Sequence, residues 1–194
     1  KTFNLNIVVI DDGSKDKTYE EAKSQNVVVL RHKVNLGKGA ALKTGCDYAY
    51  EMGAENIVVL DADGQHNPKE IPVFLDKLKS KDIVFGYRKG DESMPGILKF
   101  GNWFINQTLY RLYGMKVKDS QSGYRAFTSN TYKKIRWKAT DYYMETEMLI
   151  KAGKKSLNYA QVPIETIYND KYKGTTVLDG AKIVFSLFLW RVLR

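Results

Sequence analysis

The sequence IVVLDADGQH, residues 57–66, is the clearest local indication of the fold. Its first four residues form a continuous apolar run, which is typical of a strand buried on both faces. Asp61 and Asp63 follow directly, and Pro68 stands where the first turn of a helix would begin. A strand, a polar turn and a helix in this order predict an α/β protein whose ligands bind beyond the carboxyl ends of its strands.

The same alternation of apolar runs and helical patterns extends on both sides of this stretch. Expected strands lie at Asn6–Ile10, Val27–Leu30 and Ile83–Phe85, and expected helices at Asp16–Lys23, Ala40–Met52 and Lys69–Leu78. This alternation predicts a mostly parallel, Rossmann-like sheet sandwiched by helices, with right-handed crossovers. After Tyr87 the pattern is less regular, with expected helices at Ile97–Leu112, at Glu145–Ala152 and from Leu178, and a strand at Leu157–Val162.

The composition is that of a packed globular protein. The 194 residues fit one domain, and 43% hydrophobic with 27% charged residues exclude a disordered or collagen-like chain. A single cysteine, Cys46, excludes an internal disulfide and a thiolate zinc site. The formal charge of +9 favours an anionic partner, with nucleic acid, nucleotide phosphates or an anionic membrane face as candidates, unless the basic surface serves only solubility.

Asp61 and Asp63 form the strongest candidate site in the sequence. In extended backbone, side chains two residues apart point the same way, so the two carboxylates could share a hard cation such as Mg²⁺ or Mn²⁺. A cation held in this way usually keeps coordination positions open for phosphate oxygens. The alternative is that both residues only form the turn and cap the helix that follows.

Two further polar turns follow expected strands. In DDGS, residues 11–14, a carboxylate could accept hydrogen bonds from a ribose or a base. The sequence NLGKGA, residues 35–40, lacks the spacing of a Walker loop, but Lys38 and free backbone amides beside it could contact a nucleotide, unless the segment only starts a helix. A parallel sheet would bring both turns and the Asp61–Asp63 pair to one edge.

Taken in order, these motifs resemble the family 2 glycosyltransferases of the GT-A fold. The resemblance runs from Val9 to about Tyr168 and rests on VIDDGS (9–14), NLGKGA (35–40), DADGQH (61–66), GYR (86–88), DSQSGYR (119–125), ETE (145–147) and VPI (162–164). Within that family the chain is most similar to the dolichyl- and polyprenyl-phosphate mannose or glucose synthases. The resemblance implies a metal-dependent, inverting transfer of a sugar from a UDP- or GDP-sugar to a polyprenyl phosphate.

The resemblance also implies roles for particular residues. The implied ligands of Mg²⁺ or Mn²⁺ are Asp61, Asp63 and Gln65. The implied nucleotide-sugar contacts are Asp11, Asp12, Gly13, Lys38, Asp61, Ala62 and Asp63. The implied acceptor-phosphate contacts are Arg88, Ser122 and Arg125, and the candidate catalytic residues are Asp119, Arg88 and Arg125. Taken alone, Asp119 and Ser122 could do no more than form a turn, and Arg88 could be an ordinary surface ion pair.

The expected organisation is one GT-A domain over residues 1–176, followed by a helix over residues 177–194. Nothing before Asn6 matches the Pro-x-x-Asn-Glu type turn of the family, so either the family's first strand is absent from this sequence, which we expect, or the nucleotide site is incomplete. The final helix is amphipathic and suits the headgroup region of a membrane, or else it packs on the domain or dimerises. With a lipid-linked acceptor, we expect a peripheral enzyme on the cytoplasmic face of a membrane, with its oligomeric state open.

Two alternative functions remain at this point. One is a related transferase that extends a glycan or surface polysaccharide at a hydroxyl group, which would need Asp119 as a base. The other is a basic nucleic-acid-binding module, which the charge permits, although the sequence contains no zinc finger, RNP-like motif or basic recognition helix. We therefore expect no nucleic-acid partner.

Overall fold

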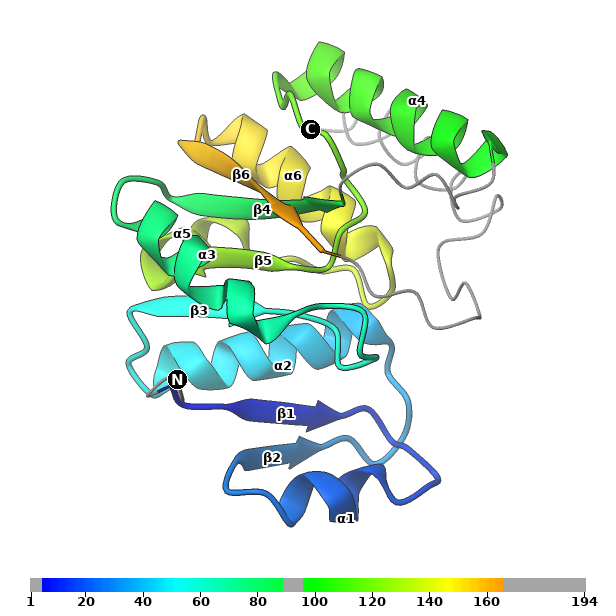
Figure 1. Cartoon of the computed structure of the whole chain (residues 1–194), viewed down its shortest axis with the longest axis vertical. Coiled ribbons are helices and arrows are strands. Elements are labelled where there is room, and N and C mark those ends of the chain that lie inside the picture. Colours follow the sequence, from blue (N-terminus) through cyan, green and yellow to red (C-terminus); the bar gives the residue numbers. More distant parts are fainter. Residues whose placement is uncertain (1–4, 89–95, 166–194) are drawn as a thin grey trace. The chain divides into compact units, whose positions relative to one another are not determined.

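The computed structural model describes residues 5–88 and 96–165, and side chains throughout these ranges except at residues 96–100. The first half contains β1 (Val8–Asp11), α1 (Thr18–Lys23), β2 (Val28–Arg31), α2 (Lys38–Glu51), β3 (Asn56–Val59), a 3₁₀ turn (Pro68–Glu70), α3 (Ile71–Leu78) and β4 (Ile83–Arg88) (Figure 1). The second half contains α4 (Gly96–Tyr113), β5 (Arg125–Thr128), α5 (Ser129–Ile135), α6 (Tyr143–Lys154) and β6 (Tyr159–Ile164). The expected strand and helix positions of the first half are close to these bounds. The helix expected from Leu178 lies outside the described residues.

The chain separates into two compact units. Unit 1 contains the described residues up to Ala54 together with Trp137–Met144, and unit 2 contains Glu55–Arg136 and the described residues from Glu145 onward. The chain therefore leaves unit 1, builds most of unit 2, and returns to unit 1 for one short segment.

Unit 1 is built on the parallel pair β1 and β2, with α2 packed against β1. The helix can approach closely because position 45 is glycine: a Cβ there would lie 2.6 Å from Cδ1 of Ile10. The returning segment is anchored by Trp137, which is buried and donates its indole N–H to the carbonyl oxygen of Gly39 over 2.8 Å. The hydrogen bond from Trp137 holds the first turn of α2 in place.

Unit 2 contains a sheet with the strand order β3-β5-β4-β6. β4 and β6 are parallel, whereas β5 runs antiparallel to both β3 and β4 and lies between them. Arg125, the first residue of β5, pairs with Val59 at the end of β3 and with Phe85 in β4. The turn that precedes β5 therefore lies at the edge of the sheet where β3 and β4 end.

The two faces of this sheet are covered by different helices. On one face α3 supplies Phe74, whose ring stacks on Tyr124 at a centroid distance of 4.3 Å, within a buried cluster that includes Val84 and Ala126. Side chains alternate along a strand, so Arg125 points to the opposite face. There its guanidinium contacts α6. This confirms the predicted α/β fold, a mostly parallel sheet between helices, and adds one antiparallel strand.

Candidate active site

In unit 1, Asp12 follows β1 and organises the turn of residues 35–37. Its Oδ1 accepts the backbone N–H of Leu36 over 2.9 Å, and its Oδ2 accepts that of Gly37 over 2.8 Å. Oδ1 also lies 2.6 Å from Nδ1 of His32. Burial acts to raise the pKa of Asp12, but the hydrogen bonds from Leu36, His32 and Gly37 together hold that pKa below its ordinary value. The carboxylate is therefore ionised at neutral pH, and it accepts its hydrogen bonds from groups of its own chain.

Asp11 and Gly13 shape the same turn from the β1 side. Asp11 is buried; its Oδ1 accepts the N–H of Ser14 over 2.9 Å and its Oδ2 lies 3.0 Å from Nε of Arg31. Gly13 has a φ of +74°, and a Cβ there would lie 2.6 Å from the carbonyl carbon of Val34. Only glycine suits a left-handed conformation so close to another backbone.

The start of α2 does not offer the free amides that the sequence suggested. The N–H groups of Gly39 and Ala40 both donate to the carbonyl oxygen of Thr140, over 2.8 and 3.2 Å. The N–H groups of Leu36 and Gly37, the two residues before Lys38, already donate to the carboxylate of Asp12. The ammonium of Lys38 lies 5.5 Å from the ring centroid of Tyr142. A nucleotide contact from this turn would thus come from the Lys38 side chain rather than from these four amides.

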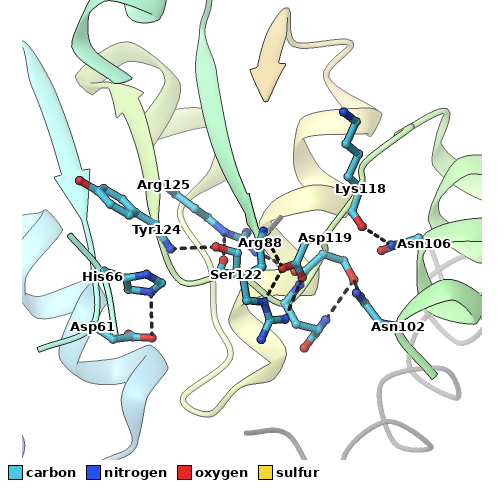
Figure 2. Close-up of polar contacts among 12 residues, drawn as sticks. Asp61, His66, Arg88, Asn102, Asn106, Lys118, Asp119, Ser122, Tyr124 and Arg125 are labelled. Atoms are coloured by element: carbon cyan, nitrogen blue, oxygen red, sulfur yellow. Dashed lines mark hydrogen bonds and ion pairs between the residues drawn. The ribbon is translucent and has the colours of Figure 1, made fainter. Parts of the chain in front are cut away.

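In unit 2, the acidic turn after β3 lies beside the turn that precedes β5 (Figure 2). Residues 62–64 form an exposed bend rather than extended backbone, which corrects the reasoning from strand alternation. Oδ1 of Asp63 accepts the N–H of Gln65 over 3.0 Å. Oδ2 of Asp61 lies 3.8 Å from Nε2 of the nearly buried His66, and a Cβ at Gly123 would lie 2.5 Å from that same oxygen. Glycine at position 123 therefore leaves room for the Asp61 carboxylate.

The side chains of this turn fit a hard divalent cation. At a metal site here, Asp61 and Asp63 would supply carboxylate oxygens and Gln65 an amide oxygen, the ligand types that Mg²⁺ and Mn²⁺ prefer. Among the described residues there is no cluster of three or more His, Cys, Asp or Glu side chains that could enclose a metal ion. A site with only two carboxylates is open, which suits an ion that must also bind phosphate oxygens.

Arg88 and Asp119 form a two-pronged ion pair at the same edge of the sheet (Figure 2). Nε of Arg88, the last residue of β4, lies 2.7 Å from Oδ2 of Asp119, and Nη2 lies 3.1 Å from Oδ1. Oδ1 also accepts the N–H of Gln121 over 3.1 Å. The Asp119 side chain is 5% exposed and that of Arg88 is 18% exposed. Asp119 therefore fixes the orientation of a partly accessible guanidinium.

Arg125 has a different position from the one expected of a phosphate ligand. Its buried guanidinium donates to the backbone carbonyls of Ser122, Glu145 and Ser120, over 3.0, 2.7 and 2.8 Å. Burial lowers the pKa of Arg125 to about 10, against the opposing effect of Glu145 and other nearby carboxylates. It remains charged at neutral pH. Its burial argues against direct contact with acceptor phosphate and in favour of a role in positioning the turn at residues 119–123.

Ser122 is also more enclosed than the sequence suggested. It is 4% exposed, and its Oγ accepts the N–H of Tyr124 over 3.4 Å. Its carbonyl oxygen is one of those bound by Arg125. Both groups of Ser122 thus hold the turn, so its position does not favour a hydrogen bond to the acceptor.

Two asparagines of α4, which sequence reasoning missed, hold the same turn from the other side. Nδ2 of Asn106 donates to the carbonyl oxygen of Lys118 over 2.9 Å, and Oγ of Ser120 donates to Oδ1 of Asn102 over 3.2 Å (Figure 2). Residues four apart on a helix share a face, so their spacing was an available signal. His32 was missed too, although it stands two residues after the apolar run that ends at Leu30, near the carboxyl end of an expected strand.

The described residues contain no helix that is both long enough and apolar enough to cross a membrane. This finding concerns residues 5–88 and 96–165 alone.

Comparison with solved structures identifies the class of this fold. Glucosyl-3-phosphoglycerate synthase from Mycobacterium tuberculosis, crystallised with Mn²⁺, UDP and phosphoglyceric acid, matches with a TM-score of 0.74 at 17% sequence identity. The match covers 96% of this chain and 67% of that one. The fold is therefore that of the GT-A glycosyltransferases.

The sequence comparison then gives the family. The model of glycosyl transferase family 2 matches residues 1–136, and the chain belongs to this family and is a glycosyltransferase. The UDP-N-acetylglucosamine–dolichyl-phosphate N-acetylglucosaminyltransferase of Methanococcus voltae is 38% identical, over 96% of this chain and 85% of that protein. The undecaprenyl-phosphate mannosyltransferase of Micrococcus luteus is 28% identical, over 90% and 76%. The predicted resemblance to the polyprenyl-phosphate group of this family is thereby confirmed.

Proposed function

We propose that this glycosyltransferase transfers a sugar, with inversion, from a UDP- or GDP-sugar to a polyprenyl phosphate at the cytoplasmic face of a membrane. The names of its relatives, which act on dolichyl and undecaprenyl phosphate, support the acceptor class. A lipid-linked acceptor also agrees with the amphipathic helix expected at residues 177–194, a segment outside the described residues. The alternative of a nucleic-acid-binding module is not retained, since the chain belongs to a transferase family.

The observation that carries this proposal is that both oxygens of the Asp119 carboxylate already accept hydrogen bonds from the chain. One oxygen receives Nε of Arg88, and the other receives Nη2 of Arg88 and the N–H of Gln121. A carboxylate held in this way is poorly placed to take a proton from an alcohol. A phosphate monoester, with a second pKa near ~6, is largely ionised at neutral pH and attacks without a base. The acceptor side is thus better suited to a phosphate than to a hydroxyl group.

On the donor side, the proposed metal ligands are Asp61, Asp63 and Gln65. A bound Mg²⁺ or Mn²⁺ would supply positive charge that stabilises the departing nucleoside diphosphate. Lys38 would add a cation for the nucleotide phosphates, presented by the turn that Asp12 holds. Arg88, oriented by Asp119, would bind the acceptor phosphate, since a guanidinium can bind two phosphate oxygens at once.

Transfer assays with matched acceptors test this proposal. The purified protein is given UDP- or GDP-sugars with Mg²⁺, Mn²⁺ or EDTA, and either a short polyprenyl phosphate or the corresponding polyprenol. We expect transfer to the phosphate alone, and its loss with EDTA. Asp119→Asn should lower this transfer by less than the roughly 10²–10⁴-fold that removal of a general base costs.

The control is Asp76→Asn, which alters an exposed carboxylate of α3 paired with Lys79 and should leave transfer unchanged. Transfer to polyprenol, together with a loss in the general-base range for Asp119→Asn, would instead support a hydroxyl acceptor. No transfer from any nucleotide-sugar to either acceptor would reject both forms of the proposal.

A further inference from the structure

We propose that His32 is a positioning residue for the donor nucleotide, because it locks Asp12 and thereby the turn of residues 35–37 that presents Lys38. This inference rests on the proposed donor role of that turn. All of its geometry lies within unit 1.

The imidazole of His32 joins three segments of the chain. Its Nδ1 lies 2.6 Å from Oδ1 of Asp12, which follows β1, and its Nε2 lies 2.9 Å from Oγ1 of Thr44 on α2. His32 itself follows β2, and its backbone N–H donates to the carbonyl oxygen of Asp11 over 2.9 Å. A side chain that is 12% exposed thus connects the ends of two strands to the helix that begins at Lys38.

The chemistry of the pair sets the direction of the hydrogen bonds. An ionised carboxylate only accepts, so Nδ1 of His32 must carry the proton and donate to Asp12. In the neutral ring Nε2 is then the acceptor, and the hydroxyl of Thr44 donates to it. A histidine tautomer is fixed in this way by the partner of its other nitrogen.

The pair also explains how a residue without a donor contact could affect donor binding. Oδ1 of Asp12 accepts hydrogen bonds from Nδ1 of His32 and from the N–H of Leu36, while Oδ2 accepts the N–H of Gly37. Without the imidazole, only the two turn amides orient the carboxylate, so Asp12 and the turn lose the contact that ties them to the end of β2 and to α2. Lys38 follows these amides directly, so its ammonium would be less ordered before the nucleotide arrives. Loss of preorganisation weakens binding without a lost contact.

The geometry of the ring nitrogens suggests a pair of diagnostic variants. In His32→Asn the side-chain amide can replace Nδ1 and donate to Asp12, whereas in His32→Gln it reaches toward the place of Nε2 and Thr44. If the bond to Asp12 is what matters, Asn should restore function and Gln should not. A residue that merely fills space would show the opposite order, since Gln is closer to histidine in size.

The experiment measures donor KM and kcat for these variants, with equilibrium binding of UDP and GDP plus Mn²⁺ as a second readout. We expect His32→Gln to raise the donor KM about tenfold with kcat nearly unchanged, because the hydrogen bond that orients Asp12 is lost and the binding of substrate and of transition state weakens equally. The donor KM of His32→Asn should stay within about threefold of that of the unaltered chain. Nitrogen NMR should find the Nδ1–H tautomer, and urea unfolding checks that each variant folds.

Ser24→Ala is the matched control, because it removes a hydrogen bond from a side chain to the carbonyl oxygen of Glu21 in the same unit, at the end of α1. An unchanged donor KM in His32→Gln, or an Nε2–H tautomer in the unaltered protein, would overturn the inference. So would equal defects in the Asn and Gln variants. If the unaltered protein binds neither nucleotide and transfers no sugar, the proposed function itself fails. If the unaltered protein does both and His32→Gln is unaffected, only the inference about His32 fails.

Discussion

At the scale of single residues, Arg125 shows how burial changes the role that a motif suggests. An arginine in a phosphate-handling family invites assignment to the phosphate, because its planar fork matches phosphate oxygens. Here the guanidinium donates its N–H groups to the backbone carbonyls of Ser120, Ser122 and Glu145 inside unit 2. Buried carbonyls without a donor cost free energy, so this guanidinium holds the turn that carries Asp119.

Arg125→Lys tests this structural role. Lysine keeps the charge but lacks the rigid fork, so it cannot serve the three carbonyls in the same geometry. We expect the free energy of unfolding to fall by about 2–4 kcal/mol, measured by urea denaturation. The control is Arg111→Lys, at an exposed position of α4. It should change the free energy of unfolding by no more than about 0.5 kcal/mol. A loss for Arg125→Lys no larger than the control's would show that the fork is not needed.

At the scale of elements, the antiparallel strand β5 assembles the unit 2 part of the candidate site. Parallel strands place their carboxyl ends at one edge, and a strand of opposite direction brings its amino end there. β5 begins at Arg125 opposite Val59 and Phe85, so the preceding turn meets the ends of β3 and β4. This register is why Gly123 lies against Asp61 and why Asp119 reaches Arg88.

The sequence predicted the local pattern better than these long-range contacts. The runs ending in Ile10 and Leu60 predicted β1 and β3 within one or two residues, because a buried strand needs a continuous apolar run. The direction and place of β5 depend on pairing with β3 across more than 60 residues of chain and with β4 across 40 or more, which no local period encodes. The helix α5 was missed for a related reason: its buried Thr131 and Tyr132 gain their stability from the tertiary packing of unit 2, not from an apolar stripe.

The same distinction applies to the candidate site. Residues at strand ends, such as Asp12 and Arg88, could be selected from the sequence because the position of a strand end is a local property. Their partners could not, because the bonds from Asp12 to Gly37 and from Arg88 to Asp119 span 25 and 31 residues. The sequence therefore identified chemistry-bearing side chains without showing which of them are already engaged by the chain itself.

Gly123→Ala tests the contact between two of these turns. The added Cβ would lie 2.5 Å from Oδ2 of Asp61 and 3.0 Å from its Cγ, so the carboxylate must turn away. Because only the end of a side chain moves, we expect the stability to fall by about 1 kcal/mol or less, while the affinity for Mn²⁺ falls about tenfold or more. Calorimetry with Mn²⁺ and UDP measures the second effect.

Gly101→Ala is the control for that experiment, since a Cβ at this position of α4 meets nothing within 4 Å. Alanine in a helix should stabilise the chain by about 0.5–1 kcal/mol and leave Mn²⁺ binding unchanged. An unaltered Mn²⁺ affinity in Gly123→Ala would mean that the orientation of Asp61 does not matter for metal binding.

At the scale of the whole molecule, the chain is divided so that each unit carries part of the proposed machinery. The turns with Asp12 and Lys38 belong to unit 1, and the residues from Asp61 to Arg125 belong to unit 2. Unit 1 is not continuous in sequence, because Trp137–Met144 returns to it after β5 and α5 have been completed. The order of the proposed donor turn thus depends on a segment about 100 residues away in the chain.

Trp137→Phe tests whether this returning segment controls the order of the donor turn. The change removes the indole N–H bond to the carbonyl oxygen of Gly39 and leaves a small cavity, which should cost about 1–3 kcal/mol. Thr140 lies on the same segment and accepts from the amides of Gly39 and Ala40, so hydrogen exchange at those amides should accelerate. Amides of the β4–β5 ladder in unit 2 should keep their protection, because no contact of unit 2 is removed. Equal acceleration in both units would show instead that the chain opens as a single cooperative body, and the segment would then have no separate influence on the donor turn.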